Sequence, residues 1–568
     1  MLNGIAVSNG IAIGKVFKYE RPMIKFKKIK GETSEELAIF EHALKQTVKE
    51  IIRIKEKASK YLGEEELAIF DAHLMMVNDI DYCGRIKEYI INGSNADMAV
   101  KCVKDYYVSK FESSDNEYFR DKALDIKDIS YHLICNIQGL TIPDLSLVDE
   151  KVIIISNELS PSDTARLDKQ YALGFCTVGG SKTSHTAIMA RTLGLPAIVG
   201  VKNIMQEVSG GDTLIIDAYD GEIIINPDLM TIEKYHQKQQ LRNEAKEELM
   251  ILANLPSLTL DNHFIDIAAN IGNDNDVSSV IKVGADSIGL YRTEFLYMNS
   301  SKDFPSEESQ FEAYKNVLSC MKGKKVVVRT LDIGGDKNLN YYNFPKELNP
   351  FLGYRAIRMS LDCEDVFRTQ LRALLKASIY GNLAIMFPLI STVNEFLRAK
   401  DILEDERIKL INEGFMVSDD IEVGMMVETP SSAIMADHFA KYADFFSIGT
   451  NDLVQYTMAA DRTSENVTYL YQPLNPAILK MIKLVIDAAH KHGKWCGMCG
   501  EMTDDNIAIP ILLGMGIDEL SMNHNSILAS RKQIRSLSKA DLLDLASDVL
   551  NFDTEEEVIS YTRKKLNL

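Results

Sequence analysis

The chain has 568 residues, of which 46% are hydrophobic and 26% charged, and its formal net charge is −19 at pH 7. This length exceeds that of a single ordinary core and predicts about two to four domains of a globular protein. The negative charge argues against general nucleic-acid binding, so any anionic ligand must be held by a local cluster of Arg and Lys.

Three features of the sequence indicate the cellular compartment of the protein. No apolar stretch approaches the roughly 18 residues that span a bilayer, so we expect no membrane insertion. The first 20 residues have no basic segment followed by an apolar one, which predicts no secretory signal. Eight cysteines are scattered along the chain, apart from the pair Cys496 and Cys499. This pattern suits a reducing cytoplasm better than a disulfide framework, and we expect a cytoplasmic protein.

The first part of the chain predicts a small α/β domain interrupted by helices. Residues 1–20 alternate apolar and small side chains and read as short strands. Within residues 21–147, apolar residues recur at i, i+3, i+4 and i+7, which predicts a helical bundle. Residues 148–227 return to strand-and-turn patterns. We expect them to form one domain with residues 1–20, so that the bundle is an insertion.

The second part predicts a linker and a barrel. Residues 228–259 are charged and helical, as expected of a connecting helix, although one more helix of either neighbour explains the same pattern. From 260 to 568, strand and helix patterns alternate, with candidate strands beginning near residues 265, 287, 325, 383, 421, 443, 494 and 519. Eight such strands favour a (β/α)8 barrel over a doubly wound sheet. The predicted class is α/β multidomain.

Polar residues follow the apolar core of the predicted barrel strands, where the active sites of such barrels form. They are Arg292, Glu294, Arg329, Asp332, Glu428, Asn451, Asp452 and Cys499. A guanidinium group binds carboxylate or phosphate through two parallel hydrogen bonds. Four arginines are therefore candidates for holding a dense anion: Arg292, Arg329, Arg355 and Arg462. Each of them alone is more often a surface or barrel-stabilising residue.

Two carboxylates of this set predict a metal site. Glu428 and Asp452 follow neighbouring strands, and Mg²⁺ commonly takes one or two carboxylates, with substrate oxygens and waters completing its shell. A structural ion pair with the arginines is the alternative. Lys337 follows a Gly-Gly turn in DIGGDK, but the spacing is not that of a P-loop. Nucleotide binding therefore has little support.

His185 opens a short predicted helix in the α/β domain, just after Lys182, Thr183 and Ser184. The free N–H groups and the dipole of a helix N-terminus stabilise added negative charge. A neutral imidazole is also available as a nucleophile near pH 7. The position suits a histidine that carries a phosphoryl group, and a capped surface histidine is the alternative.

The segment GKWCGMCGE at residues 493–501 has the spacing of a thioredoxin-like dithiol. A structural zinc site would need a second cysteine pair, which the other six cysteines do not form. The segment reads as the seventh barrel strand, and residues three apart on a strand point to opposite faces. We therefore expect Cys496 to pack in the core and Cys499 to stand alone at the strand end.

Motifs along the whole chain resemble one enzyme family. They are TSHTAIMAR with LPAIVG, GLYRTEFLYM, VVVRTLDIGGDK, NPFLGYRAIR, MFPLISTVNE, GMMVETPSSA, SIGTNDLVQYT, GKWCGMCGE and LLGMGIDELSM. In this order they resemble phosphoenolpyruvate–protein phosphotransferase, Enzyme I of the bacterial sugar phosphotransferase system. Single blocks are shared with pyruvate phosphate dikinase and phosphoenolpyruvate synthase, which need a nucleotide domain that we do not find. The nitrogen-related paralogue carries a further N-terminal sensory domain, for which we expect no room.

The resemblance implies a role for each matched residue. His185 would take the phosphoryl group of phosphoenolpyruvate, releasing pyruvate, and pass it to a histidine of the phosphocarrier protein HPr. Thr183 would orient the phosphohistidine, and Cys499 would protonate the enolpyruvate carbon. Glu428 and Asp452 would bind Mg²⁺. The substrate-binding residues would be Arg292, Arg329, Lys337, Arg355, Asn451, Asp452 and Arg462.

The resemblance also implies an assembly. The insertion would dock HPr, the barrel would bind phosphoenolpyruvate and form a homodimer, and the linker helix would let the His185 domain move between the two. One departure concerns the loop before His185, where Ser181 stands at a position that is usually Gly in the family. The hydroxyls, the positive charge and the histidine of this loop remain.

Overall fold

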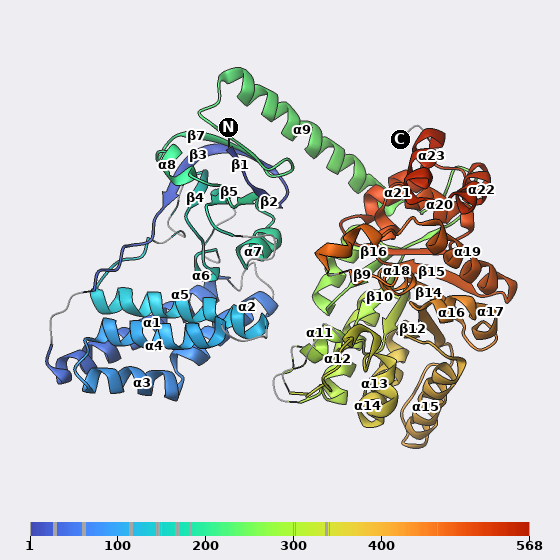
Figure 1. Ribbon diagram of the computed structural model, residues 1–568, viewed down its shortest axis with the longest axis horizontal. Helices are drawn as coiled ribbons and strands as arrows, with labels where there is room; N and C mark the ends of the chain where they lie inside the picture. Colours follow the sequence, from blue (N-terminus) through green and yellow to red (C-terminus); the bar gives the residue numbers. More distant parts are fainter. Residues whose placement is uncertain are drawn as a thin grey trace. The chain divides into compact units, whose positions relative to one another are not determined.

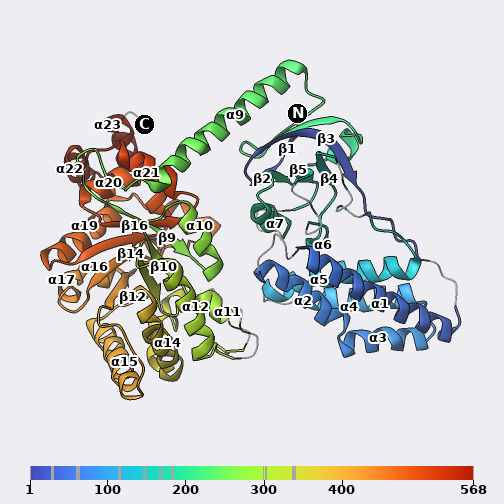
Figure 2. The ribbon, with the colours of Figure 1, turned by 180° about the vertical axis from the view of Figure 1, so that it is seen from behind.

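The computed structural model (Figures 1 and 2) describes residues 2–26, 31–58, 64–112, 117–143, 145, 148, 150–164, 167, 170–180, 185–298, 300, 303–334, 339, 341–462 and 464–566. The chain divides into two compact units, Met1–Asn243 and Glu244–Leu568. Each unit has its own buried apolar clusters, so each has the core expected of a separately folding part.

An eight-stranded mixed sheet forms the frame of the first unit. Its strands are β1 (Leu2–Asn3), β2 (Ile5–Ser8), β3 (Ile11–Tyr19), β4 (Val152–Ser156), β5 (Ala172–Thr177), β6 (Ala197–Val199), β7 (Thr213–Asp217) and β8 (Glu222–Ile225), in the order β1-β8-β7-β3-β4-β5-β6-β2. β3 pairs in parallel with β4, in register from Lys15 and Val152 to Tyr19 and Ser156. The start of the chain and the segment after residue 150 therefore share one sheet.

The predicted helical bundle lies between β3 and β4. It consists of α1 (Thr33–Ala58), α2 (Glu64–Val77), α3 (Ile80–Ile91), α4 (Ala96–Glu112) and α5 (Glu117–Gln138), which run alongside one another in Figure 1. Phe40, Ile86, Val100 and Leu133 are fully buried in a core of their own. Apolar residues at helical spacing thus bury one face of α1, α3, α4 and α5 in a shared core, as the periodicity predicts.

The rest of the first unit consists of short helices and the start of a long one. The short helices are α6 (Pro161–Thr164), α7 (His185–Leu193) and α8 (Ile204–Glu207). α9 (Leu229–Ile251) lies within residues 228–259, the segment expected to be a connecting helix. Lys238 pairs with Asp217 at 2.5 Å and with Asp220 at 2.7 Å, so the N-terminal half of α9 is anchored to the sheet. The boundary between the two units falls inside this helix.

The second unit is built on a closed barrel of eight parallel strands. They are β9 (Asp266–Ile271), β10 (Ser287–Arg292), β11 (Lys325–Arg329), β12 (Asn382–Phe387), β13 (Glu422–Val427), β14 (Phe445–Gly449), β15 (Trp495–Cys499) and β16 (Glu519–Asn523). They pair in the order of the chain, and β16 pairs with β9. Each predicted strand is present, and closure of the sheet rules out the doubly wound alternative. The predicted fold class is confirmed.

Helices surround the barrel. They are α10 (Val277–Lys282), α11 (Glu294–Met298), α12 (Glu307–Cys320), α13 (Ile357–Asp362), α14 (Glu364–Ala377), α15 (Val393–Asn412), α16 (Pro430–Ile434), α17 (Ala436–Phe439), α18 (Thr450–Met458), α19 (Pro476–Lys491), α20 (Ala508–Met515), α21 (Ile527–Arg535), α22 (Lys539–Asp548) and α23 (Glu555–Leu566). The outer strand faces and these helices form one large apolar core. In the described part of the chain, no helix is both long and apolar enough to cross a membrane.

A fully buried arginine connects the segment that follows α9 to the barrel through hydrogen bonds. Arg531 on α21 donates to the carbonyl oxygens of Leu252 (3.1 Å) and Gly284 (2.7 Å) and to Ser257 Oγ (3.0 Å), and its guanidinium lies 3.3 Å from Asp286. A buried charge of this kind is stable only because every partner is in place.

Arg531→Met is expected to lower the free energy of unfolding of the barrel by about 3–5 kcal/mol, because it leaves buried acceptors and one carboxylate without their donor. Lys532→Met is the matched control, since Lys532 is exposed on the same helix, and it should change stability by less than about 0.5 kcal/mol. Calorimetric unfolding of both variants checks this, and equal small effects would contradict the anchoring role.

Candidate functional site

The C-terminal ends of the barrel strands surround a cavity of about 220 Å³. It is lined by Leu290, Arg292, Arg329, Asp332, Arg355, Met426, Glu428, Gly449, Asn451, Asp452, Arg462, Cys499 and Gly500. Nine residues singled out in the sequence are among them: Arg292, Arg329, Asp332, Arg355, Glu428, Asn451, Asp452, Arg462 and Cys499. Lys337 lies outside the described residues.

The backbone explains how these side chains reach one cavity. Arg292, Arg329 and Cys499 are the last residues of β10, β11 and β15, and Glu428 directly follows β13. Gly449 ends β14 beside Glu428, and a Cβ atom there would lie 2.7 Å from Glu428 Cγ. Because real Cβ atoms do not approach so closely, this position must be glycine for the carboxylate to turn inward.

Arg329 is the centre of an ion-pair network at the cavity. Its guanidinium lies 2.5 Å from Glu294, 3.1 Å from Asp332 and 3.8 Å from Glu428. Burial alone would lower the pKa of Arg329, but these three carboxylates raise it. Its Nε has no hydrogen-bond partner among the described residues, which is unusual for a buried donor. The side chain is thus permanently charged and retains an unused donor.

Arg355 extends the network across the cavity. Its Nη2 lies 2.9 Å from Asp332 and 3.4 Å from Asp452, so Asp332 bridges Arg329 and Arg355. Arg462 lies 3.6 Å from the other carboxylate oxygen of Asp452. Asp332 is noted in the sequence as a strand-end residue, but the motif DIGGDK gives it no role. Its bridging position depends on a contact between separate loops that no local pattern encodes.

Glu428 and Asp452 place two carboxylates in one buried cavity. Burial, followed by the charges of Asp452 and Asp332, raises the pKa of Glu428 to about 8. The backbone N–H of Leu389 donates to Glu428 Oε2 at 2.7 Å and orients the group. Among the described residues, no three His, Cys, Asp or Glu side chains are arranged to hold a metal ion. A cation at this site would therefore depend on these two carboxylates and on ligands from substrate and water.

The two cysteines of β15 lie on opposite faces of the strand, as predicted. Cys496 is fully buried in the core outside the barrel, whereas Cys499 belongs to the cluster inside it. Because the two side chains point to opposite faces of the strand, the thiols are not placed to form a disulfide or to share a zinc ion. Burial raises the pKa of the Cys499 thiol to about 11. The group therefore holds its proton near pH 7 at the edge of the cavity.

His185 begins α7 in the first unit, as the sequence predicts, but its side chain lies outside the described residues, and so does Thr183. The following residue fixes the helix start, because Thr186 Oγ1 donates to the carbonyl oxygen of Leu159 at 2.7 Å. The start of α7 is thereby tied to the loop after β4.

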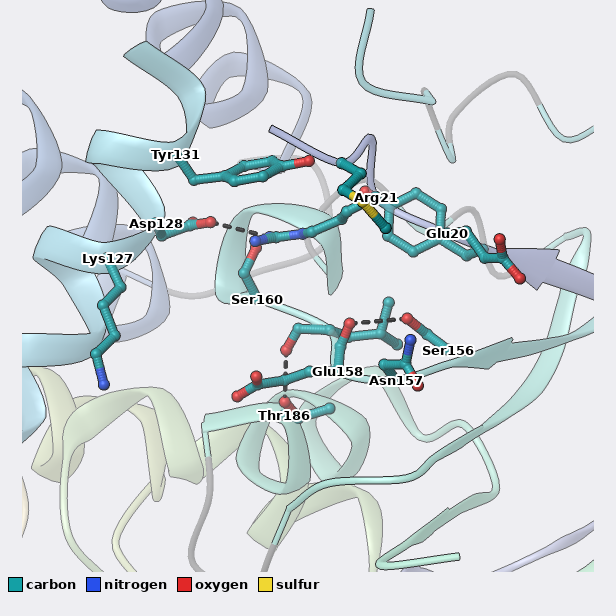
Figure 3. Close-up of a pocket in the computed structure, with 13 residues that line it drawn as sticks. Glu20, Arg21, Lys127, Asp128, Tyr131, Ser156, Asn157, Glu158, Ser160 and Thr186 are labelled. Carbon is teal, nitrogen blue, oxygen red and sulfur yellow. Dashed lines mark hydrogen bonds and ion pairs between the residues drawn. The ribbon is translucent and has the colours of Figure 1, made fainter. Parts of the chain in front are cut away.

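A cavity of about 540 Å³ adjoins this helix start (Figure 3). Its lining comes from the segment after β3, from α5, from the loop after β4 and from Thr186. Arg21 crosses the junction, 2.9 Å from Asp128 on α5 and 2.5 Å from Asp163 on α6, and thus joins bundle and sheet. This cavity was not predicted from the sequence, because its walls come from four separate segments of the chain.

Known protein families and a solved structure are similar to parts of this chain. Three family models match: "PEP-utilising enzyme, N-terminal" at residues 3–122, "PEP-utilising enzyme, mobile domain" at 148–221, and "PEP-utilising enzyme, PEP-binding domain" at 246–539. The solved structure "NMR solution structure of Enzyme I (nEIt) protein using two 4D-spectra" covers 43% of this chain and 100% of its own, at 42% identity and a TM-score of 0.40.

Curated relatives match over nearly the whole length. The phosphoenolpyruvate-protein phosphotransferase of Priestia megaterium is 51% identical, with 100% of this chain and 99% of that protein covered. That of Staphylococcus carnosus (strain TM300) is 52% identical, with 98% of each covered. That of Bacillus subtilis (strain 168) is 51% identical, with 99% of each covered. The chain therefore belongs to the phosphoenolpyruvate–protein phosphotransferase family.

Proposed function

We propose that the chain moves the phosphoryl group of phosphoenolpyruvate to its own His185 and then to a histidine of HPr, with release of pyruvate. This is the first step of the phosphotransferase system for sugar uptake, and we place it in the cytoplasm. The observation that carries the proposal is the barrel cavity, which combines an arginine cluster, two carboxylates and one neutral thiol.

The arginines supply what phosphoryl transfer needs most, which is positioning and charge neutralisation. Arg292, Arg329 and Arg462 bind the phosphate, and Arg355, Asn451 and Lys337 assist. Ion pairs with buried carboxylates fix the orientation of the guanidinium groups of Arg329 and Arg355 before the substrate binds. A preorganised donor costs little reorganisation during the reaction.

Glu428 and Asp452 would hold Mg²⁺ together with oxygens of the substrate. Burial, followed by the negative charges of Asp452 and Asp332, raises the pKa of Glu428, and a bound cation would favour its charged form. The ion would neutralise negative charge on the substrate oxygens. The donor set fits a cation that takes only one or two protein carboxylates.

Glu428→Gln is expected to raise the Mg²⁺ concentration that gives half-maximal activity by at least about 10- to 100-fold, because one charged ligand is lost. The matched control is Glu422→Gln at the opposite end of β13, where Glu422 pairs with Lys325 at 2.6 Å. Titrating both variants with Mg²⁺ checks this. An unchanged Mg²⁺ requirement in Glu428→Gln would remove this residue from the metal site.

Cys499 completes the reaction at the barrel. Once the phosphoryl group has left, the thiol proton moves to the methylene carbon of enolpyruvate, the S–H electron pair stays on sulfur, and the enolate becomes the ketone of pyruvate. The thiol must carry its proton for this step, and the raised pKa of Cys499 keeps it protonated near pH 7.

The first unit receives the phosphoryl group. His185 at the start of α7 gains from the helix dipole, and Thr183 orients the phosphohistidine. We assign residues 1–20 and 148–227 to the phosphohistidine domain and 21–147 to HPr docking. Residues 228–259 form the linker, and 260–568 form the phosphoenolpyruvate-binding barrel, through which the chain dimerises.

The experiment that tests the proposed function follows the phosphoryl group to its acceptor. The protein is incubated with Mg²⁺ and ³²P-labelled phosphoenolpyruvate, and purified HPr is then added. We expect label first on the chain and then on HPr, with one pyruvate formed for each phosphoryl group transferred. Labelled chain that passes nothing to HPr would contradict the second half of the proposal.

A further inference from the structure

Ser447 lies inside the barrel, one strand away from Cys499. Phe445 and Cys499 belong to the interior cluster, and side chains alternate along a strand, so Ser447 on β14 and Gly497 on β15 also face the interior. Ser447 is paired with Gly497, and Gly449 with Cys499. Gly497, directly across from Ser447, has no side chain. The diagonal neighbour of Ser447 on β15 is Cys499.

The hydroxyl of Ser447 reaches the sulfur of Cys499. Ser447 Oγ donates to Cys499 Sγ at 3.8 Å, and both residues are buried, Ser447 at 1% and Cys499 at 4% exposure. In the part of the chain that the structure describes, no other hydrogen bond to this sulfur is found. Catalytic hydrogen bonds are often long before substrate binds and shorten in the reacting complex.

The surroundings make this donor important. Cys499 packs in a cluster of buried hydrophobic residues that includes Leu290, Val327 and Met426. Burial raises the pKa of the thiol and the charge of Glu428 adds to this, whereas Arg329, Arg292 and the hydrogen bond from Ser447 act in the opposite sense. When substrate phosphate occupies the two arginines, their charge is neutralised and the serine hydroxyl remains.

We propose that Ser447 is a positioning residue for the protonation step, holding the Cys499 sulfur at the cavity edge and donating to the thiolate that forms there. This rests on the proposed function. As Cys499 S–H breaks and the methyl C–H bond of pyruvate forms, negative charge settles on sulfur, and Ser447 O–H points to it. After pyruvate leaves, solvent water returns the proton to sulfur.

The test compares Ser447→Ala, which removes only the hydroxyl, with Ser447→Thr, which restores it. Two quantities are measured on the full chain: single-turnover pyruvate formation from phosphoenolpyruvate, and alkylation of Cys499 by iodoacetamide against pH, followed by peptide mass. Alkylation of the exposed Cys320 shows that the reagent is active. Ser530→Ala, which removes the hydroxyl of a buried serine on α21, is the matched control.

We expect Ser447→Ala to slow pyruvate formation about 10- to 100-fold, as for a lost hydrogen bond to a charged group. Alkylation of Cys499 should shift to higher pH, because its thiolate has lost a donor. Ser447→Thr should recover both the rate and the alkylation profile. Ser447→Cys should give values between those of Ser447→Ala and the unaltered protein, and Ser530→Ala should match the unaltered protein.

Three results would overturn the proposal: an unchanged rate in Ser447→Ala, a slow rate with an unchanged alkylation profile, or a folded Ser447→Thr that behaves like Ser447→Ala. If Ser447→Ala does not fold, the same two measurements are made on Ser447→Cys. A rate of pyruvate formation and an alkylation profile of Ser447→Cys equal to those of the unaltered protein would contradict the proposal. Failure of the proposed function is distinguishable, since the unaltered protein would then form no pyruvate.

Discussion

Cys499→Ser is expected to lower the rate of pyruvate formation by about 100- to 10,000-fold, the range that a positioned general acid contributes. A serine hydroxyl at this site is a far weaker acid than the thiol, so it holds its proton when the enolpyruvate carbon requires one. Coupling pyruvate to lactate dehydrogenase measures the rate. The position of Cys499 inside the barrel, at the cavity, is the basis of this prediction.

Cys496→Ser is the matched control on the same strand. Cys496 lies in the core outside the barrel and does not line the cavity, so this variant should keep most of the activity. It exchanges one small buried group for another and tests packing alone. Equal losses in the two variants would show that the cysteines act as a pair, which would contradict the single-thiol assignment.

Arg329→Lys is expected to reduce kcat/KM for phosphoenolpyruvate by about 100- to 1,000-fold. Lysine keeps the positive charge but lacks the planar guanidinium group that contacts Glu294 and Asp332 at the same time. The buried carboxylates therefore lose hydrogen bonds, and the substrate phosphate loses a two-point contact. Initial-rate kinetics over a range of phosphoenolpyruvate concentrations checks this.

The control for this substitution is Arg368→Lys on α14. Arg368 also contacts three carboxylates, those of Glu364, Asp405 and Glu406, but on the outside of the barrel. The same chemical change there should leave kcat/KM within about twofold, since surface ion pairs contribute little. A loss in Arg329→Lys no larger than in Arg368→Lys would contradict the role of Arg329 in the cavity.

The barrel was predictable because each strand carries a local signal. Short β-branched and apolar runs such as VVVR at Val326–Arg329 are bounded by turns and followed by polar residues, and all eight such runs are strands of the barrel. Residues 1–20 and 148–227 were expected to share one domain because strand patterns resume after the helices, but the pairing of β3 with β4 is visible only in the structure. These signals depend on neighbours in sequence, which the chain displays directly.

The cavity was predictable only in part. Residues at strand ends, such as Arg329 and Cys499, were found because barrel geometry brings strand ends together. The bridging role of Asp332, the space that Gly449 leaves for Glu428, and the contact from Ser447 to Cys499 depend on register between strands. Such contacts join residues far apart in sequence, and no periodicity of the chain encodes them.

The most direct test of the whole account is the chemical identity of the phosphorylated residue. The protein is incubated with Mg²⁺ and ³²P-labelled phosphoenolpyruvate, without HPr, alongside His185→Ala. We expect label that is lost in acid and kept in base, as for phosphohistidine, located on the peptide that contains His185 and absent from the variant. No label on the unaltered protein, or equal label on His185→Ala, would contradict it.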